Sequence, residues 1–238
     1  MAENALAVSR AKAQEMLKRG DVSVDGMTVT KASFEVTEGM TVTVAENPLQ
    51  RYVGRGGLKL EAALDAFSLA PDGCVCLDVG ASSGGFTDCL LRRGAAFVYA
   101  VDAGSGQLHP SLLADERVCS MENCNARTLS PQMLATTPTF AVMDVSFISQ
   151  TLILPALRQT MTAGGTLVTL IKPQFELERS ALGKGGIVKN ERLALRAVER
   201  VLAAAKSLGF ALIGQIPSPI LGGDGNKEFL AAFSLPPQ

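Results

Sequence analysis

The stretch from Cys74 to Asp88 constrains the fold more than any other, because its hydrophobic pattern changes in the middle, around glycines. The residues up to Asp78 have the continuous apolar character of a buried strand. A loop of small residues follows at 80–85, and apolar side chains then recur at helical spacing from Phe86. The stretch predicts a strand, a tight turn and a helix start. Open α/β sheets bind ligands at such a turn, at the carboxyl end of a parallel strand.

Further buried strands alternate with helical segments along the rest of the chain. The apolar runs predict strands at 97–101, 117–120, 140–143, 166–171, 210–216 and 229–233. The last two are not separated by a helix. This order predicts a mainly parallel, Rossmann-like α/β sheet with one antiparallel edge strand.

A smaller module precedes this sheet. Arg10 to Arg19 forms a predicted helix that Gly20 stops, and Asp25-Gly26 predicts a hairpin turn between two short alternating runs. We therefore expect a small α+β domain at 1–46, a linker at 47–57 and the larger domain at 58–238. On the predicted helix, three polar side chains share an outward stripe at i, i+4 and i+8: Arg10, Gln14 and Lys18.

Composition excludes several classes of protein. A net charge of −1 provides no global attraction for nucleic acid, so RNA contact needs a local basic face. The five cysteines lack the histidine partners of a metal site, and we expect no metal and reduced thiols. No segment reaches eighteen consecutive apolar residues and no signal peptide pattern opens the chain, so we expect a cytoplasmic protein without membrane contact.

The glycine loop is compatible with three kinds of chemistry. Its spacing from Gly80 to Gly84 matches the G-x-S-x-G elbow of hydrolases, but that mechanism needs a late histidine base. The only histidine is His109, seven residues after Asp102 and poorly placed to reach Ser82. A nicotinamide dinucleotide is disfavoured because the loop lacks G-x-G-x-x-G and because Asp78 would repel a pyrophosphate.

S-adenosylmethionine suits the loop better than either alternative. Asp78 would face its ammonium group, the loop N–H groups would bind its carboxylate, and Asp102 would accept from the ribose hydroxyls. Asp102 follows Gly80 by twenty-two residues, close to the spacing at which an acidic residue after the second strand reaches a ribose. The expected cofactor-binding residues are Asp78, Gly80, Ala81, Ser82, Gly84, Gly85, Phe86, Asp102, Asn125 and Asp144.

Several separated motifs also resemble known families. The run Ser9, Arg10, Ala13, Gln14, Gly20, Val22, Val24 and Gly26 resembles the S4 RNA-binding module, with its opening helix missing or reduced. Residues 51–238 resemble FtsJ-like 2′-O-methyltransferases, and the whole chain resembles the TlyA family of haemolysins and ribosomal RNA ribose methyltransferases. The matching motifs are Gly54 to Leu60, Asp78 to Asp88, Asp144 to Ser149, Ile171 to Glu176 and Asn226 to Phe229.

This resemblance implies an enzyme that methylates ribosomal RNA on a ribose 2′-hydroxyl, with cytidine as a candidate target. It implies a catalytic set of Lys59, Asp144, Lys172 and Glu228. It also implies that Asn125 stands where the family commonly has an acid towards adenine, and that its side-chain carbonyl would accept from the adenine amino group. In our interpretation Lys172 activates the hydroxyl, Asp144 and Glu228 position Lys172 and the hydroxyl, and Lys59 stabilises the developing oxyanion. The partners would be ribosomal RNA or ribosomal subunits. The expected RNA-binding residues are Arg10, Lys12, Gln14, Lys18, Arg19, Arg51 and Arg55.

Two alternatives stay open at this point. A base-directed methyltransferase also places an acid after the fourth strand, but it resembles [Asp/Asn]-Pro-Pro-aromatic there, whereas this chain has Val145-Ser146 after Asp144. A non-enzymatic haemolysin or RNA-binding protein is the alternative from another class, although no strongly cationic amphipathic helix is evident. The sequence does not determine the oligomeric state.

Overall fold

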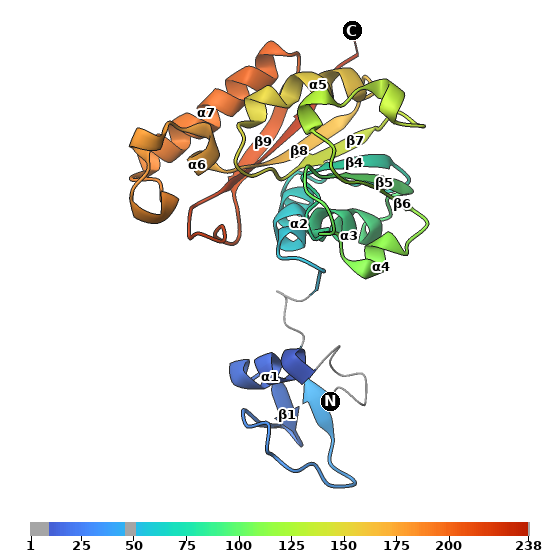
Figure 1. The fold of residues 1–238 in the computed structure, drawn as a ribbon, viewed down its shortest axis with the longest axis vertical. Coiled ribbons are helices and arrows are strands. Elements are labelled where there is room, and N and C mark those ends of the chain that lie inside the picture. Colours follow the sequence, from blue (N-terminus) through green and yellow to red (C-terminus); the bar gives the residue numbers. More distant parts are fainter. Residues whose placement is uncertain (1–9, 46–50, 238) are drawn as a thin grey trace. The chain divides into compact units, whose positions relative to one another are not determined.

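The computed structural model describes residues 10–45 and 51–237, except for the side chains of Ala11, Lys12, Glu15 and Arg19. The chain divides into two compact units, residues 1–51 and residues 52–238 (Figure 1). Each unit has its own hydrophobic core.

The smaller unit is a three-stranded antiparallel sheet with one helix. Helix α1 (Arg10–Arg19) precedes β1 (Val22–Val24), β2 (Met27–Thr28) and β3 (Val42–Val44), and the strand order is β2-β1-β3. The turn between β1 and β2 places Asp25 and Gly26 at φ 49° and 81°, the positive values that a two-residue hairpin of this type requires. The predicted helix and hairpin are therefore confirmed.

A seven-stranded sheet forms the centre of the larger unit. Its order is β6-β5-β4-β7-β8-β10-β9. The strands are β4 (Val75–Val79), β5 (Phe97–Val101), β6 (Val118–Met121), β7 (Phe140–Met143), β8 (Thr166–Ile171), β9 (Ala211–Pro217) and β10 (Phe229–Ser234). The first five pair in parallel, and β10 is antiparallel to both of its neighbours.

Helices cover both faces of this sheet (Figure 1). One core joins alternate strand residues to α2 (Gly56–Ala66), α3 (Gly85–Arg92) and α4 (Pro110–Leu113). The other core joins the opposite strand face to α5 (Leu154–Thr160) and α7 (Glu191–Ser207). A short helix, α6 (Pro173–Glu176), follows β8. Within β4, for example, Leu77 enters one core and Cys76 the other, as the period of two in a strand requires.

The mixed sheet is confirmed, but the position of its antiparallel strand corrects the prediction. The antiparallel strand β10 lies inside the sheet between β8 and β9, and β9 forms the edge. The physical reason is burial. β10 is buried through Leu230 to Phe233, whereas β9 is mostly exposed. The continuous apolar run therefore takes the interior position, although it comes last in the chain.

The segment before α2 packs on the larger unit. Tyr52 is only 7% exposed, and the Val53 N–H donates to the Asp88 carboxylate at 2.9 Å. The Gly57 N–H donates to the Gly54 carbonyl, and α2 already begins at Gly56. In the structure, the segment expected as a linker at 47–57 is thus part of the larger unit from Tyr52 onward. Residues 46–50 lie outside the described residues.

Candidate active site

The carboxyl ends of β4, β5 and β7 surround a cavity of about 380 Å³. Gly80, Asp102, Asn125 and Asp144 line it. A smaller adjoining cavity shares Gly80, Ser82, Asp144 and Ser146 with it. It adds residues of α2 and of the glycine loop and the lysine directly after β8: Gly56, Ala81, Ser83, Gly85, Phe86 and Lys172. Most residues expected to bind the cofactor therefore lie at one edge of the sheet, as parallel strands dictate.

Two glycines of the loop are required by space and by backbone conformation. Gly80 has φ 85°, and a Cβ there would lie 2.3 Å from the Asp144 carbonyl oxygen. Gly84 has φ 93°, and a Cβ there would lie 2.1 Å from the Leu112 side chain. The loop thus crosses directly beside the end of β7 and directly over α4.

Four of the loop N–H groups donate hydrogen bonds within the protein. Those of Gly80 and Ala81 donate to the Val101 carbonyl, at 2.8 and 3.1 Å. The Ser82 N–H donates to Asp102 at 2.8 Å, and the Gly84 N–H to Ala81. These four donors are used within the protein, because the loop must be held against β5. They stabilise the loop shape and do not themselves face a ligand carboxylate.

Asp78 also differs from its expected role. Its carboxylate is fully buried and lines neither cavity. Oδ2 accepts a hydrogen bond from Thr87 Oγ1 at 2.6 Å, while Oδ1 has no partner. Burial raises the pKa of Asp78 to about 7, and the Thr87 hydrogen bonds act in the opposite direction. Asp78 therefore attaches the strand end to the start of α3 from below the loop.

Asp102 and Asn125 lie where the sequence predicts, but both already hold the backbone. The two oxygens of Asp102 accept N–H groups of Ser82 and Gly104, and each keeps a lone pair for a hydroxyl donor. Asn125 Oδ1 accepts the Arg127 N–H at 3.1 Å. The carbonyl expected to accept from adenine is thus partly used in starting a 3-10 turn.

A lysine and a carboxylate face each other across the ends of β7 and β8. Lys172 Nζ lies 2.6 Å from Asp144 Oδ1 and donates to Ser146 Oγ at 2.9 Å. Pro173 follows Lys172 and begins α6, so the strand ends at the lysine. Both charged side chains are partly exposed and line the smaller cavity.

A second lysine–carboxylate pair lies beside the first. Lys59 of α2 forms a buried ion pair with Glu228 Oε2. Phe229 pairs with Ile171 in the antiparallel ladder, so Glu228 and Lys172 are neighbours at the end of that ladder. Gly56, one helical turn before Lys59, approaches Asp144. The structure therefore brings together all four residues of the expected catalytic set from four separate segments.

Sequence reasoning missed an aromatic pair at the site. Phe147 is 90% exposed and has φ 63°, and its ring packs on that of Phe175 in a tilted arrangement, with centroids 4.9 Å apart and planes at 51°. A positive φ is an outlier for a bulky residue and indicates that the surrounding loop holds it in place. Phe147 lines the larger cavity, three residues after Asp144. The signal in the sequence was an aromatic residue directly after the Asp-Val-Ser motif.

The hydrolase alternative has no geometric support. Ser82 Oγ bonds to Gln107 Oε1, whereas His109 Nδ1 bonds to Ser111 at the start of α4. The histidine therefore caps a helix, and Ser82 lacks the base that a nucleophile requires.

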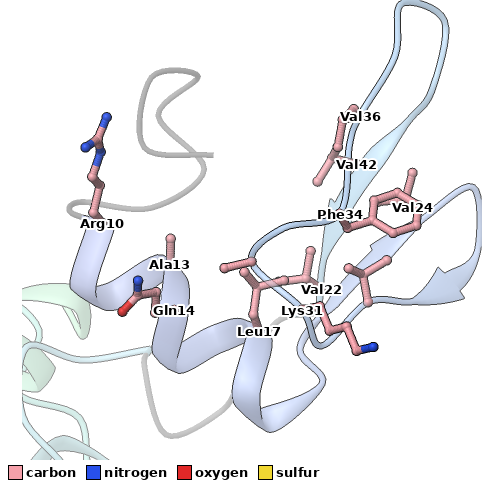
Figure 2. A pocket seen from close by; sticks show the side chains of 12 residues that line it. Arg10, Ala13, Gln14, Leu17, Val22, Val24, Lys31, Phe34, Val36 and Val42 are labelled. Atoms are coloured by element: carbon pink, nitrogen blue, oxygen red, sulfur yellow. The ribbon is translucent and has the colours of Figure 1, made fainter.

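The smaller unit has a separate groove of about 360 Å³, shown in Figure 2. Its floor is apolar, with Leu17, Val22 and Val24, and Arg10, Gln14 and Lys31 are among its lining residues. Arg10, Gln14 and Lys18 are exposed on α1, as predicted, while the side chains of Lys12 and Arg19 are outside the described part. In the larger unit Arg55 is exposed, and so is Arg51 just before it.

The fold is that of an α/β methyltransferase. The family model of the FtsJ-like methyltransferases matches residues 52–235, and that of the S4 domain matches residues 4–42. The chain therefore belongs to the FtsJ-like methyltransferase family and carries an S4 domain, as the sequence motifs predict.

Several curated relatives are similar to this chain over nearly its whole length. The 16S/23S rRNA (cytidine-2′-O)-methyltransferase TlyA of Mycobacterium tuberculosis is 42% identical over 224 residues, covering 94% of this chain and 84% of the relative. Hemolysin A of Brachyspira hyodysenteriae is 41% identical over 228 residues, covering 95% and 94%. A solved structure from Streptococcus thermophilus, whose name also refers to hemolysin, has TM-score 0.79 and 42% identity over 98% of this chain and 86% of its own.

More distant structures support the fold alone. The N-methyltransferase NodS of Bradyrhizobium japonicum has TM-score 0.55 at 15% identity, covering 81% of this chain and 99% of NodS. Among the described residues, no helix has the length and apolar character needed to cross a membrane.

Proposed function

We propose that this chain transfers a methyl group from S-adenosylmethionine to a ribose 2′-hydroxyl of ribosomal RNA. The observation that carries the proposal is Lys172, which ends β8 against Asp144 at the mouth of a glycine-walled cavity. That cavity adjoins the larger one beside Asp102. A ligand site and a proton-accepting group therefore share one edge of the sheet.

The residues of the larger cavity fit S-adenosylmethionine. Asp102 keeps acceptor capacity for two ribose hydroxyls, and Asn125 lies where an adenine edge would reach. Gly80 leaves its side of the wall without a side chain, next to the Asp144 carbonyl. When bound, S-adenosylmethionine would supply an electrophilic methyl group on a sulfonium.

The four polar residues divide the remaining work. Lys172, in its neutral form, accepts the proton of the 2′-hydroxyl, and Asp144 stabilises the ammonium that results. Lys59, held by Glu228, stabilises negative charge on the attacking oxygen. Alignment of the oxygen with the methyl group supplies a further part of the rate, because a held geometry removes the entropic cost of encounter.

Phe147 suits the base of the target nucleotide. Its ring is exposed beside the catalytic edge and is supported from behind by Phe175. An unpaired base gains about 1–3 kcal/mol by stacking on an aromatic side chain. We therefore assign Phe147 as the platform on which the target base rests while its ribose reaches Lys172.

The S4 unit would bind the RNA through its backbone phosphates. Arg10 and Lys18 of α1 present an exposed cationic stripe, which suits phosphate groups in a chain whose net charge is −1. The names of the relatives specify ribosomal RNA and cytidine, and we extend both to this chain as part of the proposal.

The test separates chemistry from binding. Lys172→Ala is expected to lower methyl transfer to ribosomal RNA at least about 100-fold, the scale of general-base catalysis, while calorimetry shows unchanged S-adenosylmethionine binding. Lys206→Ala, at an exposed lysine near the end of α7, is the matched control and is expected to have full activity.

The product identifies the acceptor atom. A methylated 2′-hydroxyl makes the adjoining phosphodiester resistant to alkali, so alkaline digestion of the product RNA should leave resistant dinucleotides. Methylation that leaves every linkage alkali-labile would refute the ribose assignment and would support the base-directed alternative. Unchanged transfer by Lys172→Ala would refute the assigned role of the lysine.

A further inference from the structure

Glu176, at the end of α6, is a buried carboxylate that the proposed reaction does not use. It is 2% exposed. Its Oε2 accepts from Ser149 Oγ at 2.5 Å, and its Oε1 accepts from the Gln150 N–H at 2.7 Å. Burial raises the pKa of Glu176, and these hydrogen bonds act against that rise. Burying a carboxylate costs free energy unless hydrogen bonds or an opposite charge compensate for it. For Glu176 this compensation comes from Ser149, Gln150 and the positive charge of Arg200.

The two acceptor bonds join two loops of the catalytic edge. Ser149 and Gln150 belong to the segment after β7, which carries Asp144 and Ser146. Glu176 ends the segment after β8, which begins with Lys172. The bonds of Glu176 therefore close a ring that passes through the Lys172–Asp144 contact.

Further hydrogen bonds attach the two loops of this ring to neighbouring elements. Gln150 Nε2 donates to the Leu170 carbonyl at 2.5 Å, and Gln150 Oε1 accepts from Thr169 Oγ1 at 2.8 Å. Arg200 of α7 donates to the Glu176 carbonyl at 2.9 Å. Both loops are thereby attached to β8 and α7, which do not themselves line either cavity.

The same ring carries the aromatic platform. Phe147 comes from the first loop and Phe175, next to Glu176, from the second, and their rings are in contact. A change in the spacing of the loops would displace the platform and the lysine together. Displacements of about 1 Å can cost about 100-fold in rate.

We propose that Glu176 is a positioning residue that sets the spacing of the two loops, and through it the placement of Lys172 and Phe147 for methyl transfer. The inference rests on the proposed function. Glu176, Ser149 and Gln150 line neither cavity, so the main effect is expected on kcat. Residues 144–148 of the first loop line the larger cavity together with the loops after β4, β5 and β6, so the affinity for S-adenosylmethionine should change less than kcat.

Two substitutions of Glu176 test this role. Glu176→Ala removes both acceptors and is expected to lower kcat by about 10- to 100-fold. Glu176→Gln keeps an acceptor for the Gln150 N–H, and its amide can donate to Ser149 Oγ, so a partial rescue is expected. The dissociation constant for S-adenosylmethionine, measured by calorimetry, is expected to stay within about threefold for both, since the changed bonds lie outside that cavity.

Thr160→Val is the matched control for loss of a buried hydrogen bond. Thr160 is fully buried, and its hydroxyl bonds only within α5, to the Ala156 carbonyl at 2.7 Å. The Thr160→Val substitution is expected to lower the free energy of unfolding without changing kcat. Hydrogen exchange is the readout that does not depend on activity: amides of 144–152 should exchange faster in both Glu176 variants and not in Thr160→Val.

The outcomes distinguish this inference from the proposed function. Unchanged kcat and unchanged exchange in Glu176→Ala would overturn it, as would an equal loss of kcat in Thr160→Val. If the alanine variant does not fold, full activity of Glu176→Gln with unchanged exchange would overturn it. A wild-type protein that does not methylate a 2′-hydroxyl would instead refute the proposed function, while the exchange result would still test whether Glu176 holds the two loops.

Discussion

Asp78 shows how a single residue can have a role that its position in a motif does not reveal. It stands directly before the glycine loop, where a contact with the ligand's ammonium group is expected. In the structure it is fully buried, accepts from Thr87 and lines neither cavity. Its influence on the ligand is therefore indirect, through the start of α3 and the loop above it.

Asp78 should make stability depend on pH. Its folded pKa of about 7 lies above the ordinary value, so between about pH 4 and pH 7 the folded state keeps a proton that the unfolded state releases. Stability is therefore lost as the pH rises through this window, by at most about 4 kcal/mol. Urea unfolding of the wild type and of Asp78→Asn between pH 4.5 and pH 8 measures this loss of stability. The free energy of unfolding of wild type minus that of the variant should fall as the pH rises. A difference that stays constant with pH would contradict the raised pKa of Asp78.

Gly80 tests the spatial requirement of the loop. Gly80→Ala adds a Cβ 2.3 Å from the Asp144 carbonyl at φ 85°, whereas Gly73→Ala meets nothing within 4 Å at φ 66°. The Gly73 variant should lose about 1 kcal/mol through backbone strain alone. The Gly80 variant should lose more and bind S-adenosylmethionine at least about tenfold more weakly, because the end of β7 must move. If the Gly80 and Gly73 variants lose the same stability and bind S-adenosylmethionine equally well, backbone strain alone explains the effect at Gly80.

At the scale of elements, the site depends on connections between segments far apart in the chain. Asn226 is an example, buried in the turn before β10. Its Oδ1 accepts the Val188 N–H at 2.9 Å, and its Nδ2 donates to the Gly186 carbonyl at 3.1 Å. The Gly222 N–H donates to the backbone carbonyl of Asn226 at 2.9 Å. One side chain thus joins the loop before α7 to the turn that carries Glu228.

Asn226→Ala should weaken both the fold and the second ion pair. It leaves two backbone groups without partners, at an expected cost of about 2–3 kcal/mol, and loosens the turn that holds Glu228 against Lys59. Asn190→Ala, which removes the exposed N-cap of α7, should cost only about 1 kcal/mol. Denaturant unfolding and methyl transfer should both distinguish the two variants. Full activity of Asn226→Ala would show that Glu228 is held independently of this loop.

At the scale of the whole molecule, two compact units divide the proposed work. The larger unit contains the complete catalytic edge, and the smaller contributes a local cationic surface to a chain of net charge −1. A nearly neutral protein gains little general attraction for RNA. Affinity should therefore depend strongly on a few residues of the smaller unit.

A double substitution measures that contribution. Arg10→Ala with Lys31→Ala removes two cations that line the groove of the smaller unit (Figure 2). The slope of log K against log salt for ribosomal RNA should become shallower by about 0.7–0.9 for each phosphate that is no longer neutralised. Binding of S-adenosylmethionine should not change. An unchanged slope would show that these side chains do not bind phosphate, and Lys206→Ala again serves as the control.

The sequence predicted most elements because their patterns are local. The periodicity from Cys74 to Asp88 is sufficient for the strand, the turn and the helix. Motif order further led to Lys59, Asp144, Lys172 and Glu228. Phe147 was missed because its importance comes from exposure and a positive φ, which no pattern of hydrophobicity encodes.

The sequence by itself determined the family, the two-part organisation and the residue types at the ligand edge, because each depends on nearby residues or on motifs in order. Only the tertiary structure decided that Asp78 is buried, that four of the loop N–H groups are bonded within the protein and that Glu176 joins two loops. It also placed β10 inside the sheet. These facts depend on which segments become neighbours after folding, and hydrogen bonds between distant segments leave no periodic trace in the sequence.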